Sequence, residues 1–195
     1  MDTMLDSLQM LIDESAARHS HLCPRQILGI RLGLAGARSI GLPAPRSDKR
    51  LLVISETDGC FVDGVEVAAG VSVGHRTLRI EDYGMTAATF VDVCSGQAVR
   101  VEPWTDLRER AALAVPDEER HYFAQMQAYQ IMPDEAMFTF QAVALTTPVE
   151  AIISKPKMRV NCAVCGAEIM NEREIIRDGV PLCRACAGPD RKSVA

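Results

Sequence analysis

Four of the seven cysteines form two CxxC pairs, Cys162 with Cys165 and Cys183 with Cys186. Seventeen residues separate the pairs, a spacing typical of a tetrahedral site made of four thiolates. We interpret this group as a zinc site, with a redox dithiol pair or an iron–sulfur site as the alternatives. Four thiolates leave zinc no open coordination position, so the spacing predicts a structural rather than a catalytic metal.

The segment between the pairs contains Asp178-Gly179, a dipeptide that favours a hairpin turn. Cys183 and Cys186 are then expected at a turn that leads into a short helix. These features predict a treble-clef or ribbon zinc finger over residues 157–195, appended to a main domain over residues 1–156. A segment this small gains its folding free energy from the metal.

A second group of chemically active residues lies in the main domain. Cys23 directly precedes Pro24 at the expected start of one helix, and Cys60 lies in the first turn of another. Helix N-termini lower thiol pKa values. Free cysteines also pack commonly in protein cores as small hydrophobic residues. Of the three cysteines outside the CxxC pairs, Cys94 is the one most readily interpreted as such a core residue. The candidate core metal or ligand site consists of His21, Cys23 and Cys60, with Asp58, His19 and His75 as secondary candidates.

These residues require a framework of helices and strands. Apolar spacing predicts helices over residues 4–20, 24–41, 61–70, 105–114 and 116–132, and strands over 50–57, 77–82, 86–93, 97–104 and 138–145. Thr57 or Asp58 is the expected N-cap of the helix over 61–70. In the second helix, glycines at 29, 33 and 36 form a face of small residues, which predicts close packing against another backbone. Helices and strands without strict alternation indicate an α+β fold.

The composition bounds the class of protein. The chain has 195 residues, of which 48% are hydrophobic and 24% charged, as in soluble globular proteins. No apolar run is long enough to span a membrane, and the acidic N-terminal segment does not resemble a secretory signal. We therefore expect a cytoplasmic protein with reduced thiols. The net charge of −5 gives no strong basic excess, which makes nucleic acid an unfavoured partner.

Two longer motifs resemble a known family. The segments "HSHLCPRQILGIRLGLAG" and "ETDGCFVDGVEVAAGVSVGHRTLRIEDYGMTAATF", together with the terminal CxxC pairs, resemble the FmdE family, whose members are similar to the FmdE component of formylmethanofuran dehydrogenase. The resemblance implies an α+β core with an auxiliary treble-clef zinc finger, assembled as a homodimer. It places His21, Cys23, Asp58, Cys60, Asp63, Gly74 and Tyr83 on characteristic family positions. The sequence departs from the family pattern at Ser20, Ala69, Val71 and Met85.

The sequence supports three hypotheses about function. The first is a metal-binding FmdE-like protein that is accessory to one-carbon or anaerobic redox metabolism. The metabolic role is implied by the family's association with a molybdenum or tungsten enzyme of methanogenesis. Such a protein would carry a second metal ion, or a small-molecule ligand, in the core. The alternative is a regulatory or interaction protein whose finger binds nucleic acid or a protein partner. In the third hypothesis, the zinc finger stabilises a homodimer. No catalytic residue is established, and whether the protein is an enzyme stays open.

Overall fold

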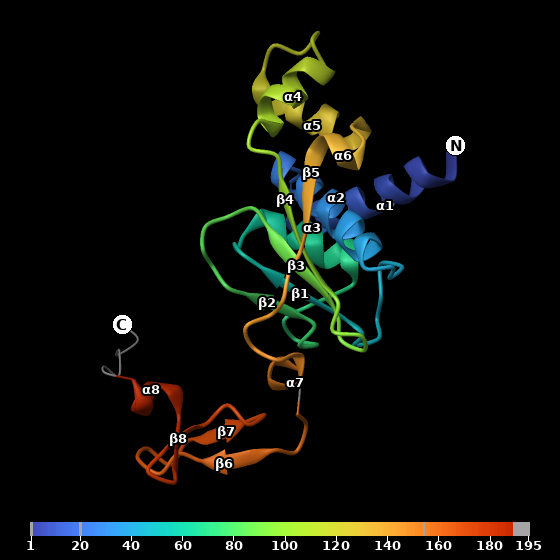
Figure 1. Cartoon of the computed structure of the whole chain (residues 1–195). Coiled ribbons are helices and arrows are strands. Elements are labelled where there is room, and N and C mark those ends of the chain that lie inside the picture. Colours follow the sequence, from blue (N-terminus) through green and yellow to red (C-terminus); the bar gives the residue numbers. More distant parts are fainter. Residues whose placement is uncertain (1, 20, 154, 189–195) are drawn as a thin grey trace. The chain divides into compact units, whose positions relative to one another are not determined.

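The computed structural model describes residues 2–19, 21–153 and 155–188, with the side chains of residues 2–6 and 19 outside the description. It divides into two compact units, residues 1–146 and 147–195, each of which is described by itself (Figure 1). The sequence motifs place the domain boundary between residues 156 and 157, ten residues beyond this division. Within the described residues, no helix is both long and apolar enough to cross a membrane.

The first unit consists of a five-stranded sheet and six helices among its described residues. The helices are α1 (Asp2–His19), α2 (Pro24–Ser39), α3 (Cys60–Ala69), α4 (Leu107–Ala114), α5 (His121–Ile131) and α6 (Asp134–Met137). The strands are β1 (Leu51–Ser55), β2 (Leu78–Ile80), β3 (Ala88–Asp92), β4 (Ala98–Pro103) and β5 (Phe138–Ala142). The strand order is β2-β1-β3-β4-β5, and this mixture confirms the predicted α+β class.

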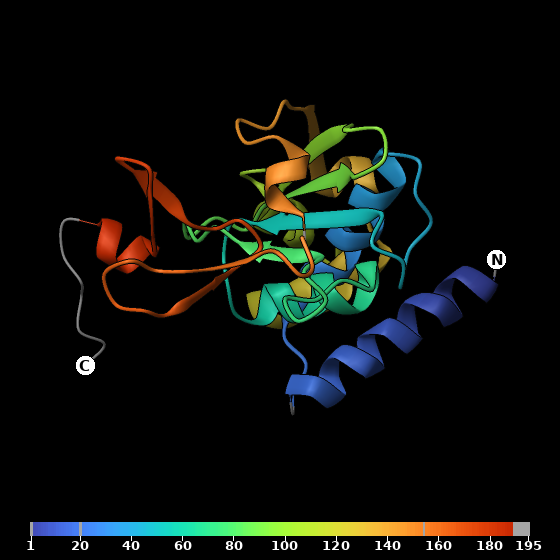
Figure 2. The ribbon, with the colours of Figure 1, turned by 90° about the horizontal axis from the view of Figure 1, so that it is seen from below.

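The sheet is antiparallel except at one edge, where β2 pairs with β1 in parallel. Every residue of β1 and β3 is buried, including polar side chains such as Ser55 and Asp92. Val53 pairs with Phe90 at the centre of the sheet. Helices α2 and α3 pack together on one face of the sheet, and α1 packs on them from outside (Figure 2).

Helices α2 and α3 approach each other unusually closely because glycines lie at their crossing. A Cβ atom built on Gly29 would lie 2.1 Å from the carbonyl oxygen of Phe61, and one on Gly64 would lie 2.2 Å from that of Gln26. Only glycine fits such backbone contact. The predicted backbone contact of the second helix is therefore confirmed at Gly29, which lies beside α3, whereas Gly36 faces the side chain of Phe90.

The helix ends agree with the sequence at three positions and differ at one. Pro24 is the first residue of α2, Gly41 follows its C-cap with a φ of 72°, and Gly70 is the left-handed C-cap of α3. The predicted N-cap of α3 is wrong, because Gly59 occupies that position instead of Thr57 or Asp58. Gly59 has a φ of 76°, a backbone conformation that glycine adopts easily and that residues with a Cβ atom adopt rarely.

Two other expectations about helices are corrected by local contacts. The helix expected from residue 116 begins at His121, because Glu118 accepts hydrogen bonds from the backbone and guanidinium of Arg120 and forms a turn. Helices α6 and α7 (Val149–Ile152) were not expected from the sequence. Each has four residues, too few for a periodic pattern to show.

The second unit contains α7 and two hairpins. The hairpins pair β6 (Arg159–Asn161) with β7 (Glu168–Met170) and β8 (Ile175–Arg177) with β9 (Val180–Leu182), and α8 (Arg184–Ala187) follows. Asp178 and Gly179 turn the second hairpin with φ angles of 50° and 77°. This matches a two-residue turn with both residues at positive φ, so the predicted hairpin is confirmed.

Candidate metal centre, thiol pair and pocket

The four cysteines of the CxxC pairs converge at one point of the second unit. Their sulfur atoms all lie within 4.8 Å of one another, with Cys162 buried and the other three half-buried. The sulfurs of Cys165 and Cys183 are 3.9 Å apart. A tetrahedral zinc with Zn–S bonds of about 2.3 Å separates two sulfurs by about 3.8 Å, so the observed spacing fits zinc.

Backbone turns position these sulfurs. Gly166 has a φ of 72° and donates its backbone N–H to the carbonyl of Cys162 at 2.9 Å, which closes the first CxxC turn. Cys183 is the N-cap of α8, and its sulfur accepts the backbone N–H of Cys186 at 3.4 Å. Both local structures agree with the sequence prediction for this region.

The electrostatics of the cluster favour a bound cation. The backbone N–H of Cys183 donates to the sulfur of Cys162 at 3.3 Å and, with further backbone N–H groups, lowers the pKa of that thiol. In contrast to Cys162, Cys186 has a raised pKa, because its thiol hydrogen-bonds with Cys183 and is partly buried. Four adjacent thiolates repel one another, and a dication at their centre removes this repulsion. The donor set is therefore that of a structural zinc site.

The first unit brings together the two thiols of the predicted core site. Cys23 is the N-cap of α2 and Cys60 is the first residue of α3; both are half-buried. Burial raises the pKa of Cys60, and the neighbouring thiol of Cys23 raises it further by its charge and by a hydrogen bond. The two helices thus present their first thiols to each other, although Cys23 and Cys60 lie far apart in the sequence.

A buried hydrogen-bond network fixes Cys23. Gln26, which is fully buried, accepts the backbone N–H of Cys23 through Oε1 at 2.8 Å. The Nε2 group of Gln26 donates to the carbonyl and the hydroxyl oxygen of Ser15 at 3.1 and 3.2 Å. Helix α1 therefore holds the first turn of α2 in place.

The remaining candidate ligands are more peripheral. His21, Asp58 and His75 are exposed, whereas the side chain of His19 and all of Ser20 lie outside the described residues. Among the described residues, the four-cysteine cluster is the one group of three or more His, Cys, Asp or Glu side chains that could hold a metal ion, and it does not include Cys23 or Cys60. The structure thus brings together two of the predicted core ligands.

The family departures fall into two classes of environment. Ala69 and Val71 are buried in the core, so apolar side chains fill these two positions. Met85 is exposed in the loop that follows β2, beside Tyr83, which matches the family pattern and is also exposed. This loop is attached to β1, because the carbonyl of Glu56 accepts the backbone N–H groups of Tyr83 and Met85 at 2.9 and 3.1 Å.

Two residues have roles that the sequence did not reveal. The carboxylate of Glu56 is buried and accepts hydrogen bonds from Nε and Nη2 of Arg100 at 2.6 and 2.8 Å, which raises the pKa of Arg100. Cys94 is exposed in the turn after β3, so its interpretation as a core cysteine is wrong. Its backbone N–H donates to Asp92 at 3.0 Å, and this turn contact places the thiol outside the sheet.

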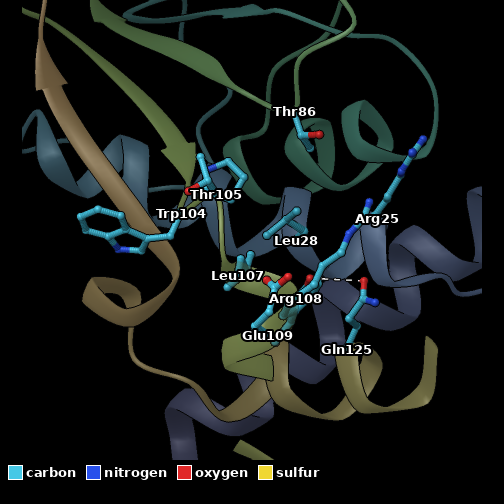
Figure 3. A pocket seen from close by; sticks show the side chains of 11 residues that line it. Arg25, Leu28, Thr86, Trp104, Thr105, Leu107, Arg108, Glu109 and Gln125 are labelled. Carbon is cyan, nitrogen blue, oxygen red and sulfur yellow. Dashed lines mark hydrogen bonds between the residues drawn. The ribbon is translucent and has the colours of Figure 1, made fainter. Parts of the chain in front are cut away.

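A pocket of about 390 Å³ lies between α2, α4, α5 and the ends of β3 and β4. Its lining includes Arg25, Thr86, Arg108, Glu109, Gln125 and Tyr129 (Figure 3). The sequence analysis did not identify it, because its residues come from four separate segments. The sequence feature that could have indicated this pocket is an arginine in the first turn of each of two helices, Arg25 in α2 and Arg108 in α4.

Comparison with known proteins identifies both units. The model of the family described as FmdE, molybdenum formylmethanofuran dehydrogenase operon, matches residues 18–139, more than half of the chain. The chain belongs to the FmdE family. Residues 157–191 match the family of prokaryotic dksA/traR C4-type zinc fingers, which agrees with the cysteine cluster. The resemblance stated from the two N-terminal motifs is thereby confirmed.

Two individual relatives extend the comparison. A probable S-adenosyl-L-methionine-binding protein of Archaeoglobus fulgidus is 33% identical over 86 residues, which are 43% of this chain and 24% of that protein. This FmdE chain therefore matches only about a quarter of that relative's length. The crystal structure of a tungsten formylmethanofuran dehydrogenase FmdE-like protein from Syntrophus aciditrophicus superimposes with a TM-score of 0.60 at 19% identity. That match covers 93% of this chain and 92% of the other, and it supports the fold alone.

Proposed function

We propose that this FmdE-family protein binds a structural zinc ion in its finger and a second, functional metal ion at Cys23 and Cys60. The observation that carries the proposal is the contact between these two thiols at the adjoining N-terminal ends of α2 and α3. The description of the family and the name of the solved relative support a role as an accessory to molybdenum- or tungsten-dependent one-carbon metabolism.

The chemistry of the pair suits a soft divalent cation. Burial and the neighbouring Cys23 raise the pKa of Cys60, in contrast to the lowered pKa expected at a helix start, so both thiols ionise only at an electrostatic cost that a bound metal ion offsets. Thiolate and imidazole ligands select zinc and similar ions. His21 is exposed two residues before Cys23, and in this proposal its imidazole turns toward the two thiols when the metal binds and becomes the third ligand. A site with three protein ligands keeps one position open for a substrate or for another molecule.

Metal analysis of the purified full chain tests the proposal. We expect the wild type to contain one more tightly bound metal ion per chain than the double variant Cys23→Ser, Cys60→Ser. The matched control is Cys94→Ser, because Cys94 is exposed and lies outside both groups. Circular dichroism checks that each variant is folded. Equal metal content in the wild type and the double variant would refute the proposed metal site at Cys23 and Cys60.

A second candidate function rests on the surface of the finger. Its apolar side chains are unusually exposed: Val164 is 70% and Ile176 is 60% accessible, and Met158, Met170 and Val180 are exposed as well. A folded unit this small gains stability by covering such groups. This observation favours a protein partner over nucleic acid, and we propose that the partner is a second copy of the chain.

The oligomeric state in solution tests this homodimer. We expect the full chain to elute with the mass of a dimer in size-exclusion chromatography with light scattering, and Val164→Asp with Ile176→Asp to shift it to the monomer. A monomeric wild type refutes the proposal. Saturable, salt-dependent binding of DNA or RNA by the full chain, lost when residues 157–195 are deleted, would support the alternative function.

The compartment is also part of the proposal. All seven cysteines are free thiols in the structure, four of them in the zinc cluster. Free thiols persist in reducing compartments, so we propose that the protein acts in the cytoplasm.

A further inference from the structure

The pocket between α2, α4 and α5 contains two arginines without a protein partner. Arg25 and Arg108 both line it and both are exposed to solvent. Among the described arginines of the first unit, these two make neither an ion pair nor a hydrogen bond. Each of the others has an interaction, as in the pairs of Arg31 with Asp134 and Arg50 with Asp92. Two unpaired cations that line one cavity indicate an anionic ligand.

The positions of the two arginines strengthen this argument. Arg25 is the second residue of the 16-residue helix α2, and Arg108 is the second residue of α4. The partial positive charge at a helix N-terminus repels a cation in the first turn and attracts an anion. The first turn of α2 has no acidic residue to compensate. In the first turn of α4, Glu109 offsets part of this repulsion, so a bound anion would relieve it mainly at the start of α2.

The rest of the lining supplies neutral hydrogen-bonding groups. The hydroxyl of Tyr129 donates to Oε1 of Gln125 at 3.3 Å, which leaves the amide nitrogen of Gln125 to donate to a ligand. Thr86 lies across the pocket from Gln125, with the two arginines between them in the view of Figure 3. Glu109 also lines the pocket, so the ionised side chains there carry one net positive charge.

We propose that this pocket binds a small organic molecule through a carboxylate or phosphate group, with Arg25 and Arg108 as the two charged partners. Guanidinium groups bind both oxyanions through paired hydrogen bonds. A volume of about 390 Å³ is within the range of small-molecule sites. Glu109 gives the site a preference for ligands that also carry a hydrogen-bond donor or an ammonium group.

Isothermal titration calorimetry of the full chain tests the site with two probes, inorganic pyrophosphate for phosphates and citrate for carboxylates. We expect at least one probe to bind saturably, and the stronger one identifies the ligand class. Arg25→Gln and Arg108→Gln should each weaken that binding by about tenfold, the loss expected for a charge-assisted hydrogen bond. Glu109→Gln should strengthen it, because the variant removes the opposing charge.

The matched control is Arg38→Gln, which changes the same charge on the same helix. Arg38 lies near the far end of α2 and pairs with Asp134 at 3.0 Å, outside the pocket lining. Absence of saturable binding by both probes overturns the proposal, as does equal binding by the wild type and both pocket variants. The double variant Cys23→Ser, Cys60→Ser should bind the probe normally, so this test is independent of the proposed core metal.

Discussion

Replacing Gly29 by alanine tests the close packing that positions the thiol pair. The new Cβ atom would lie 2.1 Å from the carbonyl oxygen of Phe61, whereas ordinary contact begins at 3.4 Å, so the two helices must separate by about 1.3 Å locally. Alanine improves helix propensity by about 1 kcal/mol. Overpacking costs about 1–3 kcal/mol, and here the cost lies at the upper end because the obstacle is backbone that cannot rotate away.

The balance predicts that Gly29→Ala destabilises the first unit by about 2 kcal/mol. Urea unfolding followed by tryptophan fluorescence measures this, because Trp104 is the single tryptophan of the chain and lies in the first unit. With an m-value of about 2 kcal/mol/M, the midpoint should fall by about 1 M. The same variant should weaken any metal binding by Cys23 and Cys60, since it moves α2 away from α3.

Gly33→Ala is the matched control one helical turn later. Its Cβ would lie 3.0 Å from the Cβ of Ala68, a contact with a side-chain atom that a small shift relieves. We expect a change within about 1 kcal/mol of zero, because propensity and packing nearly offset each other. A Gly29→Ala variant as stable as the wild type, or more stable, would show that α2 and α3 do not touch as described.

Two further predictions concern zinc and pH. Chelation of zinc should unfold the second unit, seen as loss of circular dichroism together with zinc release, while the fluorescence of Trp104 in the first unit stays unchanged. A simultaneous change in Trp104 fluorescence would refute the prediction that zinc stabilises the second unit alone. Asp92 binds Arg50 at 2.8 and 2.9 Å, and this hydrogen bonding holds the pKa of Asp92 well below its usual range. The pair therefore stabilises the fold above about pH 4, and this stability is lost as the pH falls toward the folded-state pKa. Asp92→Asn should lower stability at pH 7 and flatten the acid dependence, and an unchanged slope of stability against pH below 4 would be inconsistent with this role.

The sequence alone determined the features that depend on neighbouring residues. The spacing of Cys162, Cys165, Cys183 and Cys186 predicted the four-thiolate cluster, because each CxxC turn is local and the metal geometry demands the second pair. Asp178-Gly179 predicted its hairpin for the same reason. Glycine spacing in the second helix predicted a close backbone contact but did not name its partner.

Only the tertiary structure decided which distant segments meet. Gly29 finds its partner in Phe61, and that contact brings Cys23 to Cys60, two thiols that no local pattern connects. The exposure of Cys94 depends on a turn held by Asp92, which a strand pattern does not reveal. The pocket needs α2, α4 and α5 in place at once, because its cations lie in separate helices and its walls come from side-chain packing across the first unit.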